Sequence, residues 1–379
     1  MVDHDSLRDY RPPQPALESF SGEGLVLYCG DDLPSIGTAA AVIGPDDHRL
    51  WTVVQRHAGA RRVHAWSFAT PDWLAPGLPI ELTDRPAGFA LPRDGVLRFD
   101  EEMIRPLGED DDGLPLWPEA PQWAELDPKR PSLNLGIDVL DVLAPIADGG
   151  LNLIVDTSSD DAVFHHLATR LFEAAEPRSL LVTAEDSPLL SKPSPSFHLP
   201  PRSGVQGHIA ALQCTIALAT ELRQTPSSLA VVELPPISSP PEFDASNANK
   251  GPRSGIADIV ARLGRHLVST KDGRITTVLR LHVPQDPTGL GAIIDTLSLG
   301  DVDATLFVDG DGRFHPGRSH SRADVDDATA LRRRELLQTL ELAGRARDKS
   351  AIFGDQELTD AERRALEDSQ TLRPSLMPK

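Results

Sequence analysis

The chain has 379 residues, and its 37 Lys and Arg against 57 Asp and Glu give a formal net charge of −20 at pH 7. The length allows more than one hydrophobic core, and a composition of 40% hydrophobic and 25% charged residues is typical of globular rather than disordered proteins. The acidic balance disfavours nucleic acid, and no apolar run has the length of a transmembrane helix, so we expect neither a nucleic-acid partner nor membrane insertion.

The first third of the chain predicts a tail followed by a small all-β domain. Residues 1–20 are polar and proline-rich and predict an extended tail. Residues 21–95 contain short apolar runs separated by turn sequences such as GPDD and HAGA, which predicts a β-barrel. Residues 96–130 are rich in proline and acid and predict a connecting segment.

The remainder predicts an α/β domain and then a helical one. Residues 131–318 alternate strand-like runs such as LNLIV and SLAVVEL with amphipathic helices such as VFHHLATRLFEAA, which predicts a parallel sheet covered on both faces. Residues 319–379 are charged and helical, and Thr359 with Glu362 has the spacing of a capping box. The fold class is therefore multi-domain α/β with an N-terminal barrel and a C-terminal helical domain.

Cysteine content and the N-terminus bear on the cellular compartment. Cys29 and Cys214 are too few for a disulfide framework or a zinc cluster, which fits a reducing environment. The N-terminal residues lack the pattern of a targeting peptide. We expect a cytoplasmic protein, peripheral to a membrane complex if it joins one, or an organelle protein whose transit peptide has been removed.

Five segments in order resemble the β subunit of F-type ATP synthases, across the barrel, the α/β domain and the helical domain. They are VVQRHAGARRVHAWSFATPDWLAPGLPIELTDRP, APQWAELDPKRPSLNLGIDVLDVLAPIADGG, LVSTKDGRITTVLRLHVPQDPTG, SLGDVDATLFVDGDGRFHP and AIFGDQELTDAERRAL. The resemblance implies that the central domain is RecA-like, of the type that carries a phosphate-binding loop.

That loop is degenerate in this chain. The family has G-G-A-G-V-G-K-T, whose backbone N–H groups, lysine and threonine hold the phosphates and Mg²⁺. No glycine lies between Gly150 and Gly204, and Lys192 is the sole lysine in that interval. The matching stretch here is Asp156, Thr157, Ser158, Ser159, Asp160, Asp161, Ala162 and Val163.

The three aspartates of this stretch predict poor phosphate binding. A pair of like charges 4 Å apart costs about 4 kcal/mol at an effective dielectric constant near 20. The alternative is that these side chains solvate a surface turn and that Ser159, Asp160 or Asp161 caps the following helix. Either interpretation disfavours ordinary MgATP binding.

The resemblance also assigns counterparts to the other nucleotide contacts. Glu233 matches the Mg²⁺-associated acid, and Asp186, or Glu185 one register away, matches the general base. The adenine platform corresponds to Phe314 and His315, for which ordinary packing of Phe314 is the alternative. We therefore expect no resident cofactor or metal, with weak adenine-nucleotide binding as the exception.

The helical domain keeps an acidic turn that, in the family, meets the rotating central stalk. A charged run of this kind is otherwise a solvated surface. The residues we expect to contact a partner are Gln356, Glu357, Leu358, Thr359, Asp360, Ala361 and Glu362.

Two main functions, and a third alternative, follow from these observations. We expect a non-enzyme that docks to ATP synthase α-, β- or γ-type subunits, or to a paralogous ring, as an assembly factor, regulatory factor or non-catalytic ring member. The alternatives are an ATPase with a remodelled active site and a free-standing scaffold. The resemblance carries the first of these, because a fold alone does not determine a function.

Overall fold

The computed structural model divides into two compact units, formed by Met1–Pro118 with Phe197–Leu218 and by Glu119–Ser196 with Ala219–Lys379. It describes residues 14–21, 24–68, 70–90, 96–98, 103–109, 111–158, 161–174, 179–184, 196–199, 212–218, 227–233, 264–283, 302–372 and 376.

The first unit is built around an antiparallel β-barrel, as the alternating pattern predicts. Its strands pair in the order β1-β2-β5-β4-β3-β6, and their inward side chains form one apolar cluster. The barrel strands are β1 (Ala16–Ser21), β2 (Gly24–Tyr28), β3 (Thr38–Ile43), β4 (Arg49–His57), β5 (Arg62–Trp66) and β6 (Ile80–Phe89).

The barrel closes through β1, which lies mostly in the segment for which the sequence predicts a polar tail. Ala16 bridges to Pro79 beside the start of β6, and the Leu17 N–H donates to the Leu78 carbonyl oxygen at 2.8 Å. Leu17 is buried in the barrel. Residues 16–21 are therefore barrel and not tail, because their backbone completes the hydrogen bonding of both neighbouring strands.

Part of the predicted connecting segment also belongs to this unit. The two short strands β8 and β9 both pair with the second half of β6, and β7 pairs with β14. Gly37 approaches Trp117 so closely that a Cβ there would lie 2.8 Å from the Trp117 Cβ. The bounds are β7 (Val96–Arg98), β8 (Arg105–Pro106), β9 (Leu114–Pro115) and β14 (Ser196–Leu199), with a 3₁₀ turn η1 at Pro45–Asp47.

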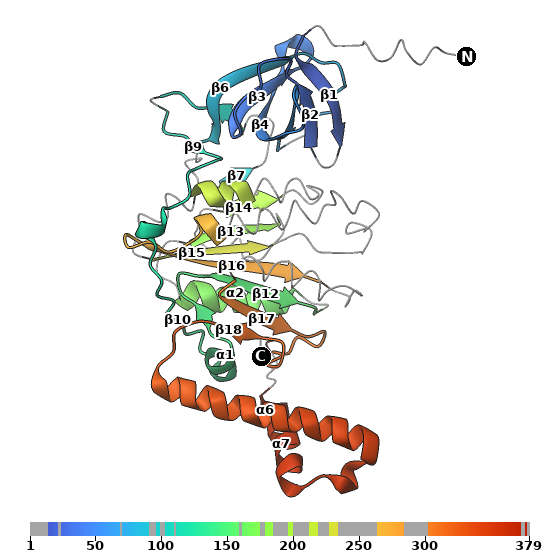
Figure 1. Cartoon of the computed structure of the whole chain (residues 1–379), viewed down its shortest axis with the longest axis vertical. Helices are drawn as coiled ribbons and strands as arrows, with labels where there is room; N and C mark the ends of the chain where they lie inside the picture. Colours follow the sequence, from blue (N-terminus) through green and yellow to red (C-terminus); the bar gives the residue numbers. More distant parts are fainter. Residues whose placement is uncertain are drawn as a thin grey trace, which may run out of the picture. The chain divides into compact units, whose positions relative to one another are not determined.

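The second unit contains the predicted parallel sheet. Its strands lie in the order β18-β17-β12-β16-β15-β13, parallel except for β18 (Figure 1). Strands β12, β16 and β17 are buried along nearly their whole length, which explains their continuous apolar sequences. The bounds are β12 (Leu151–Asp156), β13 (Ser179–Ala184), β15 (Ser227–Glu233), β16 (Arg274–His282), β17 (Ala304–Val308) and β18 (His320–Ser321), with the small pair β10 (Ser132–Leu133) and β11 (Ile146–Ala147).

Helices in the described part of the chain pack on this sheet. Helix α2 (Ala162–Ala174) follows β12 directly and buries Phe164, Leu167 and Leu171. The same core takes in residues from α1 (Asp138–Leu143) and from the middle of the sheet. The helical period of apolar residues in α2 is thus used to cover the sheet.

The C-terminal part of the chain forms the predicted helical pair. Helix α6 (Asp327–Phe353) packs against α7 (Asp360–Thr371), with the 3₁₀ turn η6 (Asp355–Glu357) between them (Figure 1). The Asp326 carboxylate caps α6 by accepting from the Thr329 N–H at 2.7 Å. None of the helices in the described ranges is long and apolar enough to cross a bilayer.

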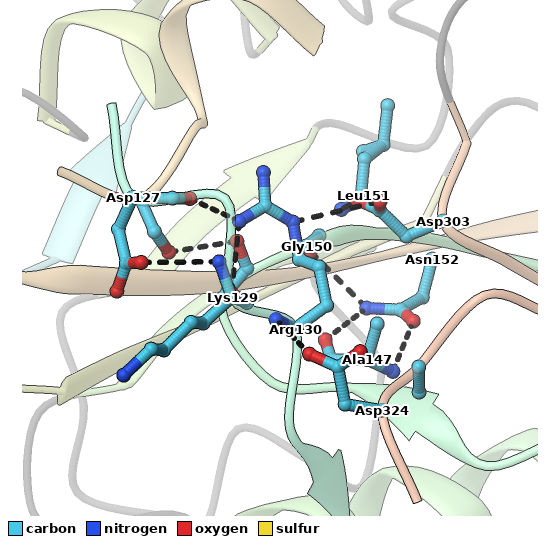
Figure 2. Close-up of polar contacts among 12 residues, drawn as sticks. Asp127, Lys129, Arg130, Ala147, Gly150, Leu151, Asn152, Asp303 and Asp324 are labelled. Carbon is cyan, nitrogen blue, oxygen red and sulfur yellow. Dashed lines mark hydrogen bonds and ion pairs between the residues drawn. The ribbon is translucent and has the colours of Figure 1, made fainter. Parts of the chain in front are cut away.

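A polar network holds the incoming chain against the amino ends of the parallel strands (Figure 2). The Arg130 N–H donates to Asp324 at 2.9 Å, and the Arg130 guanidinium donates to the Asp127 carbonyl oxygen and lies 3.5 Å from Asp303. Asp303 in turn accepts from the Leu151 N–H at 2.9 Å. The segment that begins with the 3₁₀ turn η2 (Trp123–Glu125) is therefore fixed in place before β12 starts.

Asn152 occupies the centre of this edge and satisfies backbone groups that would otherwise be buried without partners. Its carboxamide oxygen accepts from the Ala147 N–H at 2.7 Å. Its Nδ2 donates to the carbonyl oxygens of Ala147, Gly150 and Thr277 at 3.0, 3.1 and 3.2 Å. The side chain is completely buried, so these bonds are shielded from water.

We predict that Asn152→Ala lowers the free energy of unfolding of the α/β unit by about 2–4 kcal/mol, because it leaves buried backbone groups unpaired. Urea denaturation followed by circular dichroism measures this loss. Asn134→Ala is the matched control, since Asn134 accepts one bond from Gly136 in an exposed turn and should cost less than 1 kcal/mol. Equal losses in the two variants would contradict the prediction.

Candidate functional site

The loop after β12 folds back onto the protein. Asp156, the last residue of β12, is buried, and its Oδ1 accepts from the Ser158 N–H at 3.0 Å and the Ser158 hydroxyl at 2.5 Å. The Thr157 N–H and hydroxyl both donate to the Val308 carbonyl oxygen, at 3.1 and 2.9 Å. The backbone donors of the first two loop residues are thus bonded to protein acceptors. Ser159 and Asp160 lie outside the described residues.

A buried arginine lies beside this loop, at the carboxyl end of the neighbouring strand β16. The Arg280 Nη2 donates to Asp156 at 2.8 Å and to Asp161 at 2.5 Å. Its Nε donates to Asp156 at 3.1 Å and its Nη1 to Glu233 at 2.9 Å. The guanidinium carbon also lies 4.6 Å from the centre of the Phe164 ring. We call Arg280, Asp156, Asp161 and Glu233 the Arg280 cluster.

The Arg280 cluster joins four elements of the sheet domain. Asp156 ends β12, Glu233 ends β15, Arg280 lies near the end of β16, and Asp161 directly precedes α2. Parallel strands bring their carboxyl ends to one edge, which is where open α/β sheets bind ligands. The cluster therefore occupies the edge where the resemblance places the nucleotide phosphates.

The charges in the cluster affect one another. Burial opposes the charge of Arg280, but Asp156, Asp161 and Glu233 raise the pKa of its guanidinium, so it stays protonated. Burial likewise opposes ionisation of Asp161, but the hydrogen bond and charge of Arg280 lower the pKa of this carboxyl. The guanidinium of Arg280 and the carboxylate of Asp161 therefore stabilise each other's charged form.

This arrangement changes the expectation that the aspartates simply repel phosphate. Asp156 and Asp161 are paired with a cation whose presence sequence reasoning missed. A signal for it existed, because Arg280 interrupts the apolar strand sequence VLRLHV, and a buried charge requires a partner. His282, two residues further on, was missed as well, and its Nε2 lies 3.0 Å from the Ser158 carbonyl oxygen.

The remaining predicted nucleotide contacts have different placements. Glu233 lies in the cluster, whereas Glu185 and Asp186 lie outside the described residues. Phe314 is fully buried in the main core, as the packing alternative expects. The His315 ring is half-buried and meets the Phe307 ring edge-on, with centroids 5.9 Å apart. In the Phe314 and His315 pair, His315 is thus the one with partly accessible atoms.

Ala162 and Val163 form the first turn of α2. Val163 is buried in the sheet core, so its side chain serves packing at the place where the family has a hydroxyl for Mg²⁺. The Asp161 carbonyl oxygen accepts from the His165 N–H at 3.0 Å, which makes Asp161 the residue at the start of the helix.

The acidic turn of the helical domain has both internal and exposed parts. Thr359 and Glu362 form the predicted capping box. The bonds from Thr359 and Lys349 lower the pKa of Glu362 to about 2. Leu358 is buried, while Gln356, Glu357, Asp360 and Ala361 are exposed.

An apolar tip precedes this turn. The last two residues of α6, Ile352 and Phe353, have 72% and 67% of their surface exposed. Asp355 and Glu357 follow them on η6, and both are exposed. The tip of α6 is therefore an apolar pair with acidic neighbours.

Comparison with solved structures confirms the fold. No protein-family model matches the chain. The chain is similar to the assembled ATPase EscN from the type III secretion system of enteropathogenic E. coli, with a TM-score of 0.68 and 12% sequence identity. The similarity covers 96% of each chain. A barrel, a sheet domain and terminal helices in this order are thus the fold of a known ATPase; the narrower resemblance to ATP synthase β stays a prediction.

The same comparison corrects one expectation. The sequence led us to expect a non-enzyme, because the phosphate loop is degenerate. The chain matches an ATPase over nearly its whole length, which contradicts that expectation. The expectation extended one altered loop to the whole protein and did not include the Arg280 cluster at the same edge.

We predict that Arg280→Met lowers the free energy of unfolding by about 3–5 kcal/mol, since it leaves buried carboxylates without a counter-charge. Urea denaturation measures the loss. Arg170→Met is the control, because Arg170 is an exposed residue of α2 that pairs with Glu173 and should change stability by about 0.5 kcal/mol or less.

The pH dependence of this loss separates charge from packing. Without Arg280 the buried carboxyls have raised pKa values, so the variant should regain stability as pH falls from 7 to 5 and protons bind. In the wild-type protein the lowered pKa of Asp161 keeps its contribution complete above the ordinary value of 3.8, and acid removes it only below that. A variant whose loss is the same at both pH values would contradict a charge effect.

Proposed function

We propose that the protein is an ATPase with a remodelled nucleotide site at the carboxyl edge of its parallel sheet. The observation that carries the proposal is the Arg280 cluster, a buried guanidinium with strand-end carboxylates, located at this edge in the fold of an ATPase. The resemblance of five segments to ATP synthase β supports the same substrate class. Catalysis at this edge is electrostatic and positional rather than covalent.

The cluster supplies two of the chemical groups that phosphoryl transfer needs. Arg280 is a permanent cation with donors arranged in a fork, which suits phosphate oxygens. Glu233 has the strand-end position of the Mg²⁺-associated acid. Within the described part of the chain, no group of three His, Cys, Asp or Glu side chains could hold a metal ion. In our proposal Mg²⁺ arrives bound to the phosphates of the nucleotide.

Adenine binding is proposed to be weak. His315 is the accessible member of the predicted platform, and its N–H donates to the Phe307 carbonyl oxygen at 2.9 Å, which fixes it at the end of β17. The loop after β12 lies against this same strand end through the bonds from Thr157 to Val308. The base and phosphate contacts proposed from the resemblance thus belong to neighbouring strand ends.

We predict that the purified full chain releases phosphate from MgATP and that Glu233→Gln lowers the turnover at least tenfold. The substitution keeps the size of the side chain and removes its charge from the proposed metal-bound phosphates. A phosphate-release assay on parallel preparations measures this. A contaminating ATPase would give both preparations the same rate, and either equal rates or no release from the wild type would contradict the proposed activity.

We further propose that the protein works within an assembly, docking to ATP synthase α-, β- or γ-type subunits or to a paralogous ring. The exposed tip of α6, with Ile352 and Phe353 beside acidic η6, favours this role, since apolar groups with a charged rim are typical of interfaces. The solved neighbour is itself an assembled ATPase. A cytoplasmic location, peripheral to a membrane complex, follows from the same proposal.

We predict that Ile352→Ser with Phe353→Ser abolishes co-purification of α- or γ-type subunits from native cells, because two exposed anchors are lost. Affinity purification with mass spectrometry measures the partners. Leu331→Ser is the matched control, since Leu331 is also exposed on α6 but lies a distance of 21 residues from the tip. Absence of such subunits from the wild-type sample would contradict the docking role.

A further inference from the structure

The three carboxylates around Arg280 differ in how firmly they are held. The side chains of Asp156 and Glu233 are 1% and 16% exposed, and each ends a β-strand. The Asp161 side chain is 58% exposed and follows the loop rather than a strand. Asp161 is therefore the carboxylate that can leave Arg280 without disturbing the sheet.

We propose that Arg280 is the phosphate-binding cation of this chain and that Asp161 is a tethered carboxylate that holds its place until a phosphate displaces it. The ligand class is a nucleoside polyphosphate or pyrophosphate. Carboxylate and phosphate oxygens accept from the same guanidinium fork, so one can replace the other on the Arg280 Nη2, which donates to Asp161 at 2.5 Å. This inference rests on the proposed function and identifies its phosphate contact.

The charges around Arg280 account for the need for such a displacement. The chain lacks a lysine in the loop, so a polyphosphate must find its cation elsewhere on the edge. Asp156 and Glu233 hold two sides of the guanidinium and keep it oriented. The third side is covered by Asp161, the exposed one, and leads outward to solvent.

A displaced Asp161 has another position to adopt. Its carbonyl oxygen already accepts the first bond of α2 from His165, so it stands at the N-cap of this helix. Aspartate is among the favoured residues at that position, where the carboxylate accepts N–H groups of the first helical turn. His282, whose Nδ1 lies 3.8 Å from Asp161, is the other group that the movement would release.

The test is the affinity for pyrophosphate, measured by calorimetry on the full chain. We expect Asp161→Asn to bind about tenfold more tightly than the wild type, the gain for a site that Asp161 closes about nine-tenths of the time. Asp311→Asn is the matched control, because Asp311 is an exposed aspartate in the loop after β17. This substitution removes the same charge from the protein as Asp161→Asn does. It should change the affinity less than twofold.

A second variant links the gain to Arg280. Adding Arg280→Lys to Asp161→Asn keeps the positive charge but loses the fork, so the tenfold gain should disappear while circular dichroism stays unchanged. Asp161→Asn that binds pyrophosphate no more tightly than the wild type overturns the inference. If the wild type still releases phosphate from MgATP in that case, the proposed function stands. Tighter binding without any hydrolysis overturns the function and keeps the inference.

Discussion

The pairing of a buried guanidinium with three carboxylates determines the carboxyl edge of this sheet. Taking charges out of water is costly, and a partly buried cluster persists only when its members satisfy one another. Arg280 does so by joining the ends of β12, β15 and β16 to the start of α2. Together with the bonds from Thr157 to Val308 and the apolar packing of α2, this side chain fixes the residues on both sides of that edge.

The two edges of the sheet use charge in different ways. At the amino edge, Arg130 and Asn152 satisfy backbone groups and acidic partners, which fixes the incoming chain and leaves little chemistry exposed (Figure 2). At the carboxyl edge, the acids outnumber the cation and one of them is exposed. An exposed carboxylate contributes little to folding, which agrees with the proposed role of Asp161 in ligand binding.

The sequence predicts the fold better than it predicts the site. Short alternating runs identify the barrel strands and continuous apolar runs the parallel strands, because burial on one or two faces produces those patterns. Strand β1 lacks this pattern, since Leu17 is buried while Glu18, Ser19 and Phe20 are exposed, and its place depends on barrel closure. The missing glycines after β12 are visible in the sequence, but the partner of Asp156 comes from 124 residues further along the chain.

The expectation of a non-enzyme has the same limit, because it too was based on residues that are close together in the sequence. It treated the loop as the entire site, although a cation can enter a parallel-sheet edge from any neighbouring strand. A lysine on a flexible loop can extend its side chain toward a phosphate. An arginine near the end of a strand is fixed in place, so the anion has to bind where the strand holds the guanidinium. A fixed cation needs an internal anion as its partner when no ligand is bound. An exposed carboxylate at the start of a helix can be that partner and can leave with the smallest rearrangement.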